Sequence, residues 1–295
     1  MPATHPPATL TIVEQRQSRD GTRKLVLRTH DGAAIEAVVI PGPGRVTLCV
    51  SSQVGCALAC RFCATGAGGF TRDLSAAEIV AQLHQAEAGR THAERITNVV
   101  FMGMGEPLLN LPAVLGAIRA LTDPRGLAIA PRRITVSTAG IVPKIRPLLE
   151  SGPVNLAVSL HATTDAVRDR LVPVNRRHPL GDLLGALRDE PLVSKRRPVL
   201  FEYTLLEGVN DTVADAERLP ALLRDIPCRL NVIPMNPYPG AADRGSPPEA
   251  IARFTAAAHA GGIRVTLRRD RGTDIAAACG QLATAARPRP APAPA

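Results

Sequence analysis

Residues 45–63 read Arg45-Val-Thr-Leu-Cys-Val-Ser-Ser-Gln-Val-Gly-Cys-Ala-Leu-Ala-Cys-Arg-Phe-Cys63. A strand-like apolar run over Val46–Val50 is followed by three closely spaced cysteines, Cys56, Cys60 and Cys63. Three thiolates supply all but one of the ligands of a cubane iron–sulfur cluster, so one iron would be left open for a substrate or cofactor. A zinc site would need a fourth protein ligand, and no nearby Cys or His offers one at the usual spacing. We predict an iron–sulfur cluster here, with zinc or inert cysteines as alternatives.

Beyond this stretch, strand-like apolar runs alternate with segments of helical periodicity. The predicted strands are residues 46–50, 98–102, 134–137, 154–160, 199–206, 230–234 and 263–267. The predicted helices are residues 75–83, 111–121, 142–150, 180–188, 212–224, 248–258 and 274–285. This alternation indicates a parallel sheet with helical crossovers. We predict an α/β fold whose catalytic domain, residues 45–285, is an incomplete (β/α)6-type barrel, because a full barrel needs about two more units.

The N-terminal residues have a different pattern. From residue 9 to residue 44, short β-branched stretches are separated by turns at Asp20-Gly21 and Asp31-Gly32, and Asp-Gly between such stretches is a strong hairpin signal. We predict a small antiparallel β appendage of three strands. Residues 1–8 and the Pro/Ala-rich tail, residues 286–295, are predicted to be disordered.

Composition narrows the class of protein. The chain carries a net charge of +9, which would suit a nucleic-acid partner, although an Arg-, Ala- and Pro-rich composition is equally typical of a GC-rich genome. No apolar run is long enough for a membrane span, and the N-terminus lacks the pattern of a signal peptide. Three of the six cysteines lie too close together for a disulfide framework, which indicates a reducing compartment. We predict a cytoplasmic protein without a membrane partner.

A second motif, Met102-Gly-Met-Gly-Glu-Pro107, follows the second predicted barrel strand. In β/α barrels the chemistry lies at the carboxyl ends of the strands, where the cysteine cluster would also lie. Glycine lets the backbone approach a ligand closely, and the Glu106 carboxylate could pair with an ammonium group. Taken alone the motif is weak evidence, since many such stretches are only turns.

Together the two motifs are more specific. Cysteines spaced C-x3-C-x2-C, with the aromatic Phe62 before the last, and a Gly-Glu-Pro after the next strand resemble the radical S-adenosylmethionine (SAM) superfamily. The resemblance implies a [4Fe-4S] cluster held by Cys56, Cys60 and Cys63, whose open iron chelates the amino and carboxylate groups of SAM. Reduction of the cluster would then yield a 5′-deoxyadenosyl radical.

Five longer stretches resemble one family within this superfamily, the RlmN/Cfr adenine methyltransferases of large-subunit ribosomal RNA. These stretches are residues 47–56, 101–107, 158–162, 236–240 and 277–282. The resemblance implies that SAM is held by Gly105, Glu106, Ser137, Ser159, Leu160, His161 and Asn236.

The same resemblance implies three catalytic residues. Cys279 matches the cysteine that the family methylates on sulfur, and a second SAM supplies the radical that converts this methyl into a methylene that adds to the adenine. Cys49 matches the cysteine that releases the adduct by forming a transient disulfide with Cys279, and Glu36 matches a proton-accepting carboxylate. An adenine C–H is too weakly nucleophilic for polar methyl transfer, so a radical route with a covalent tether is chemically reasonable.

Without the resemblance, each of these residues has a simpler interpretation. Cys49 would be a small buried apolar residue of a strand, and Cys279 a packing residue of a helix. His161 would be a hydrogen-bonded core histidine, and Glu36 an exposed residue of an alternating strand.

We therefore predict a methyltransferase acting on C2 of an adenine in 23S rRNA, with some transfer RNAs as further substrates. The alternatives are a C8-directed enzyme, a radical enzyme with another substrate, and an iron–sulfur RNA-binding protein without turnover. The family's ribosomal members carry a helical domain ahead of the barrel, whereas only the small predicted sheet precedes it here, which leaves RNA docking open. We expect a monomer reduced by a donor such as flavodoxin.

Overall fold

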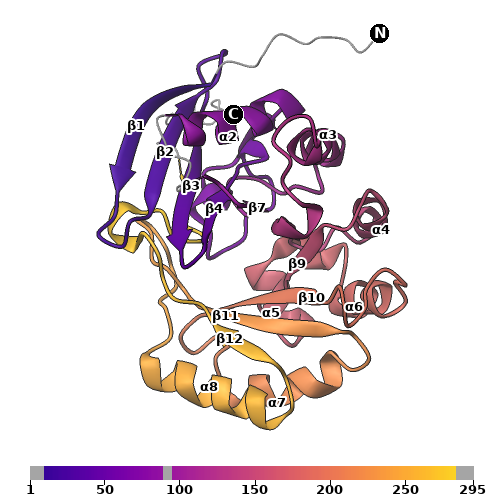
Figure 1. Ribbon diagram of the computed structural model, residues 1–295. Coiled ribbons are helices and arrows are strands. Elements are labelled where there is room, and N and C mark those ends of the chain that lie inside the picture. The colour runs from indigo at the N-terminus through magenta and orange to yellow at the C-terminus, as the bar shows by residue number, and fades with distance from the viewer. Residues whose placement is uncertain (1–9, 89–94, 284–295) are drawn as a thin grey trace, which may run out of the picture.

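The computed structural model describes residues 10–88 and 95–283 (Figure 1). The segments predicted to be disordered, residues 1–8 and 286–295, lie outside the described residues. The described residues form a ten-stranded sheet with the order β1-β2-β3-β4-β7-β8-β9-β10-β11-β12. Its strands are β1 (Thr11–Gln17), β2 (Arg23–Arg28), β3 (Ala34–Gly42), β4 (Arg45–Cys49), β7 (Asn98–Phe101), β8 (Ile134–Thr138), β9 (Asn155–Ser159), β10 (Val199–Leu205), β11 (Cys228–Pro234) and β12 (Val265–Leu267).

Every neighbouring pair of strands from β4 to β12 is parallel. At least one helix follows each of these strands up to β11: α1 (Ala64–Ala67), α2 (Ala76–Glu87), α3 (Leu111–Thr122), α4 (Val142–Glu150), α5 (Asp165–Leu171), α6 (Leu180–Arg188), α7 (Val213–Leu222) and α8 (Pro248–Ala260). Figure 1 shows the larger helices on the outer side of the curved sheet. The α/β fold predicted from the alternating pattern is confirmed. None of the helices in the described parts of the chain is long and apolar enough to cross a membrane.

The antiparallel strands β1, β2 and β3 extend the barrel sheet. β3 pairs antiparallel with β4, in a register that places Val38 opposite Cys49. The three strands therefore continue the barrel sheet through β3, and Leu25, Leu27 and Ile35 are buried in the same core.

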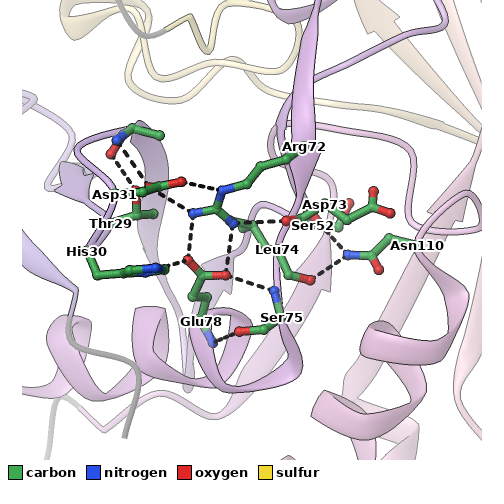
Figure 2. Close-up of polar contacts among 11 residues, drawn as sticks. Thr29, His30, Asp31, Ser52, Arg72, Asp73, Leu74, Ser75, Glu78 and Asn110 are labelled. Atoms are coloured by element: carbon green, nitrogen blue, oxygen red, sulfur yellow. Dashed lines mark hydrogen bonds and ion pairs between the residues drawn. The ribbon is translucent and has the colours of Figure 1, made fainter. Parts of the chain in front are cut away.

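A charged network fixes the turn between β2 and β3 to the barrel (Figure 2). The guanidinium of Arg72, in strand β6 (Phe70–Asp73), donates to Asp31 at 2.7 Å and to Glu78 at 2.8 Å. Glu78 also forms a capping box with Ser75 at the start of α2. Because β6 pairs with β5 (Gln53–Gly55), which leads into the cysteine loop, the network connects the N-terminal strands to the site described below.

The short elements β5, α1 and β6 were not predicted, and two helices also differ from the prediction. The helix predicted over residues 274–285 is wrong for the described part, where a single 3-10 turn, Thr273–Ile275, is followed by an irregular loop. Ala276 and Gly280 adopt positive φ angles of 52° and 84°, which a helix cannot accommodate. Helix α5 was not predicted, because four of its seven residues are charged and mask the helical apolar pattern.

Candidate active site

A cavity at the carboxyl ends of the parallel strands brings most of the predicted site residues together. Its lining includes Cys56, Cys60, Cys63, Gly105, Glu106, Ser137, Ser159, His161, Asn236 and Cys279. Three predicted residues, Glu36, Cys49 and Leu160, lie outside this lining.

The cysteine loop leaves β5 and begins α1. Burial raises the pKa of the Cys56 thiol to about 12 and raises that of Cys60 strongly as well. These buried sulfurs would ionise only beside a strong positive charge, which the iron of a cluster supplies. In the described parts of the chain no three His, Cys, Asp or Glu side chains converge on one ion, and a cubane, with one thiolate on each iron, needs no such convergence. The donor set therefore fits the predicted cluster.

The Gly-Glu-Pro turn packs directly against the start of the cysteine loop. Met104 accepts backbone hydrogen bonds from Ser52 and Gln53 at 2.9 and 3.2 Å, and the Glu106 amide donates to the Gln53 side chain at 2.8 Å. Gly105 has a φ of 101°, and a Cβ there would lie 2.5 Å from the Gln53 Cβ. Glycine is therefore needed for this close packing within the protein, whereas the sequence analysis attributed it to ligand approach.

Glu106 is buried, with its carboxylate at the cavity wall. Its two oxygens accept hydrogen bonds from the amides of Leu108 at 2.9 Å and Ala139 at 2.7 Å. Burial nevertheless raises the pKa of Glu106 to about 7, and these hydrogen bonds only partly oppose the shift. A cationic or N–H-bearing ligand group would stabilise the charged form.

His161 is both a satisfied buried histidine and a cavity residue. Its Nδ1 accepts a hydrogen bond from the Thr204 amide at 2.9 Å, so its remaining proton lies on Nε2. Burial lowers the pKa of His161 to about 3, which keeps the ring neutral. The ring packs on Phe62 of the cysteine loop at a centroid distance of 4.4 Å, which links strand β9 to the cluster ligands.

Arg168, in α5, holds the ends of β8 and β9 and was missed by the sequence analysis. Its fully buried guanidinium donates to the carbonyls of Leu160 at 2.9 Å, and of Ala139 and Ser159 at 2.7 Å. A fourth hydrogen bond, to the Asn175 side chain, measures 2.7 Å. Leu160 thus contributes its backbone to this tether, with its side chain in the core.

The loop carrying Cys279 is bound to the cysteine loop. The Ala64 amide donates to the Gly280 carbonyl at 2.7 Å, and the Asn236 amide group donates to the Cys279 carbonyl at 3.3 Å. Gly280, at positive φ, lies so close to Phe62 that a Cβ would be 2.9 Å from its carbonyl oxygen. These contacts place Cys279, whose surface is exposed, in the same cavity as the cluster cysteines.

Cys49 and Glu36 lie beside this loop. Burial raises the pKa of the Cys49 thiol to about 12, and the thiols of Cys49 and Cys279 are close enough to influence each other electrostatically. Glu36 is buried, unlike the exposed residue suggested by its strand pattern alone. It pairs with Lys24 at 3.3 Å and accepts a hydrogen bond from the Ala283 amide at 3.1 Å.

Two further charged residues of the lining, Glu202 and Arg268, were not predicted. Glu202 lies in the middle of β10, and Arg268 follows β12. A signal for Glu202 was present, since it is the charged residue of a strand that is otherwise almost wholly apolar and buried. Arg268 stands in an Arg-rich stretch, residues 268–271, that gave no comparable signal.

Comparisons with known proteins agree with one another. Residues 50–219 match the family model described as "Radical SAM superfamily". The chain is 50% identical over 273 residues to "Dual-specificity RNA methyltransferase RlmN" of Syntrophobacter fumaroxidans (strain DSM 10017 / MPOB), covering 92% of this chain and 80% of that protein. It is 49% identical over 299 residues to the protein of the same name from Anaeromyxobacter sp. (strain Fw109-5), covering 97% and 79%.

Solved structures give the same result. The crystal structure of a radical SAM methyltransferase from Sphaerobacter thermophilus superimposes with a TM-score of 0.87 at 49% identity, covering 93% of this chain and 81% of that one. Streptococcus suis SuiB has a TM-score of 0.54 at 11% identity, over 76% of this chain and 49% of that one, and shares the fold.

Proposed function

The chain belongs to the radical SAM superfamily and, within it, to the RlmN family, and from this membership we propose that it methylates C2 of an adenine in RNA through a methyl carrier at Cys279. It is a SAM-dependent RNA methyltransferase that uses a [4Fe-4S] cluster and SAM. The proposed substrates are 23S rRNA and some transfer RNAs. The cytoplasmic location, the monomeric state and a flavodoxin-type electron donor stay predictions.

One observation carries the proposal: Cys279 lines the same cavity as the three cluster cysteines and Glu106. The Ala64–Gly280 hydrogen bond fixes the carrier loop to the cluster loop, so a methyl group on Cys279 Sγ would lie inside the cavity where the radical forms. Preorganisation of this kind is what a radical reaction needs, because a free radical must meet its target before it meets solvent.

Each wall of the cavity has a proposed task in holding the cofactors. Cys56, Cys60 and Cys63 would bind the cluster, and Glu106 would accept hydrogen bonds from the amino group of SAM. Gly105, Ser137, Ser159, Leu160, His161 and Asn236 would complete the SAM site. When bound, these cofactors supply a methyl group and a 5′-deoxyadenosyl radical.

The remaining steps belong to the protein's own residues. Cys279 accepts the methyl group on its sulfur, and its carbon later joins the adenine. The Cys49 thiolate then attacks the Cys279 sulfur and breaks the bond between that sulfur and the methylene carbon, which takes up a proton and leaves on the base as its new methyl group. The disulfide that remains must be reduced before the next turnover. Both thiols must ionise for these steps. Burial raises the pKa of the Cys49 thiol, desolvation of the Cys279 sulfur by the surrounding protein raises that of Cys279, and the positive charge of Arg268 opposes both shifts. Glu36, held by Lys24, is the proposed proton acceptor.

Mass spectrometry of RNA nucleosides tests the proposal. The reconstituted protein, with SAM and a reductant, should convert adenine of an unmodified 23S rRNA fragment into 2-methyladenosine. Formation of 8-methyladenosine would move the reaction to C8 and contradict the C2 assignment. Absence of both products, with a fully loaded cluster and cleaved SAM, would contradict RNA methylation itself.

A further inference from the structure

Glu202 presents one unused hydrogen-bond acceptor to the cavity. Its side chain is buried, and its Oε2 accepts from Asn231 at 2.8 Å. Its Oε1 accepts no hydrogen bond in the described parts of the chain. This oxygen is also not one of the fully buried polar atoms without a partner, so we infer that it is accessible from the cavity that Glu202 lines. A carboxylate oxygen in such a place has room for a donor from a ligand.

Arg268 presents unused donors to the same cavity. Its backbone amide is fixed to the Val232 carbonyl at 2.8 Å, but its half-buried guanidinium makes no hydrogen bond or ion pair within residues 10–88 and 95–283. The group is near enough to Glu202, Cys279, Cys49 and Asp270 for their charges to affect its pKa, yet it is paired with none of them. Its N–H donors are therefore available to a ligand that enters the cavity.

We propose that Glu202 and Arg268 together read the target adenine, with Glu202 Oε1 accepting from the exocyclic N6 amino group and Arg268 donating to the adjacent ring nitrogen. This inference rests on the proposed function and specifies how that site selects its base. Adenine presents the N6 donor beside a ring-nitrogen acceptor, so one acceptor and one donor on the protein match it. Guanine and hypoxanthine present O6 in place of the amino group, and a carboxylate repels it.

The position of the pair suits this task. Arg268 and Cys279 line both the main cavity and a smaller one beside it, so the two side chains are neighbours. A base held by Arg268 would therefore lie next to the sulfur that delivers the methyl group. Enzymes that modify bases read the extruded base by hydrogen bonds to its polar edge inside such a pocket.

Base analogues test the Glu202 contact directly. RNA hairpins carrying adenine, purine without the N6 amino group, or hypoxanthine at the target position would be methylated in single turnovers by wild type, Glu202→Ala and Glu202→Gln. Wild type should prefer adenine to purine by roughly ten- to a hundred-fold. Glu202→Ala should bring this ratio close to one. Glu202→Gln, whose amide can donate to O6, should raise the relative rate on hypoxanthine.

The outcomes separate the two proposals. If wild type does not methylate the adenine hairpin, the proposed function fails. If it does, and Glu202→Ala keeps the wild-type ratio of adenine to purine, only the base-reading inference fails. Glu207→Ala, an exposed carboxylate outside the cavity, is the matched control and should keep the wild-type ratio.

The Arg268 contact is tested with 1-deaza- and 7-deazaadenine, each lacking one ring nitrogen. The wild-type methylation rate should be roughly ten-fold or more lower on one of the two analogues than on adenine, and Arg268→Met should methylate that analogue and adenine at similar rates. Arg269→Met, an exposed neighbour outside both cavities, should keep it. If Arg268 serves only as a charge beside Cys279, Arg268→Met will slow methylation of Cys279 without RNA, measured by protein mass, and keep the wild-type deaza sensitivity. That result would overturn the assignment of Arg268.

Discussion

The two walls of the cavity differ in how completely their polar groups are bonded. The cofactor wall comprises residues 50–63, 101–107, 137–139 and 159–161. Here both oxygens of Glu106, the Nδ1 of His161 and the guanidinium of Arg168 behind the wall all have protein partners. These three side chains are therefore fixed before any ligand arrives.

The acceptor wall comprises residues 202–204, 233–235, 268 and 279–282, whereas Asn236 belongs to the proposed SAM site. Glu202 keeps one free oxygen, Arg268 has no bonded partner in the described residues, and Cys279 is exposed. A prebonded wall suits cofactors that are the same in every turnover, whereas unpaired donors and acceptors suit a substrate that must be recognised and released. The difference supports the proposals that the first wall binds the cofactors and that the second recognises the base.

Removing a thiol from each wall should block a different step of the reaction. These substitutions should reduce RNA methylation more than any other change in the site. Cys279→Ala should lower RNA methylation at least about a thousand-fold, because no carrier sulfur remains, while SAM cleavage persists. Cys60→Ala should abolish both activities together with the cluster absorbance. Counting methylated nucleosides and 5′-deoxyadenosine in one assay checks both variants. Methylation by Cys279→Ala at wild-type rates would refute the carrier role.

Cys49 should separate formation of the adduct from its release. Cys49→Ala should methylate Cys279 and join it to RNA, but the adduct should persist because no second thiol attacks the sulfur. A covalent RNA–protein species on a denaturing gel is the expected result, with turnover limited to about one. Cys228→Ala is the control, since this half-buried cysteine lies outside the cavity. Normal turnover without a trapped species would contradict the resolving role of Cys49.

The free energy of unfolding of two arginine variants, one for each wall, tests whether the walls differ in their internal hydrogen bonding. Arg168→Met would remove three hydrogen bonds to backbone carbonyls, although the Leu160 carbonyl keeps a bond from the Ala162 amide. A buried acceptor left without a partner costs about 1–3 kcal/mol, so we expect a loss of about 3–5 kcal/mol in free energy of unfolding. Arg268→Met removes no hydrogen bond and should cost less than about 1 kcal/mol. Urea midpoints of the two ligand-free variants check this. Equal losses would show that the walls do not differ in their internal bonding.

The sequence predicts the cofactor wall better than the acceptor wall, for a physical reason. Cys56, Cys60 and Cys63 lie on one short loop, and Glu106 follows a strand end, so local spacing and strand order are enough to bring them together. Helices with regular apolar periodicity, such as residues 142–150 and 180–188, were predicted to the residue.

The acceptor wall depends on contacts between segments far apart in the chain. The loop that carries Cys279 contacts Phe62 and Ala64 through Gly280, and this irregular loop, which has no periodicity, was predicted to be a helix. The guanidinium of Arg268 lies beside Cys279 only in the folded chain, and no spacing in an Arg-rich sequence reveals this. Arg168, behind the cofactor wall, was missed for the same reason, because its partners lie on other segments. Glu202 alone had a local signal, a carboxylate within an apolar strand.

The smallest expected effect concerns the pH dependence of the cofactor wall. The pKa of Glu106 is raised to about 7 by burial, so the ligand-free carboxyl is half protonated near neutral pH. Only the carboxylate accepts a hydrogen bond from the amino group of SAM while keeping both of its backbone bonds. Affinity for SAM should therefore rise with pH up to about 7, level off above it, and fall roughly ten-fold for each unit below.

Equilibrium dialysis of SAM against the reconstituted protein between pH 6 and 8 measures this slope, with the cluster absorbance recorded at each pH. Glu106→Gln should bind SAM more weakly at pH 8 and show no slope, since an amide does not titrate in this range. Glu202→Gln should keep the wild-type slope, because Glu202 belongs to the acceptor wall. A slope that disappears in Glu202→Gln instead would place the cofactor's amino group on the opposite wall from the one assigned.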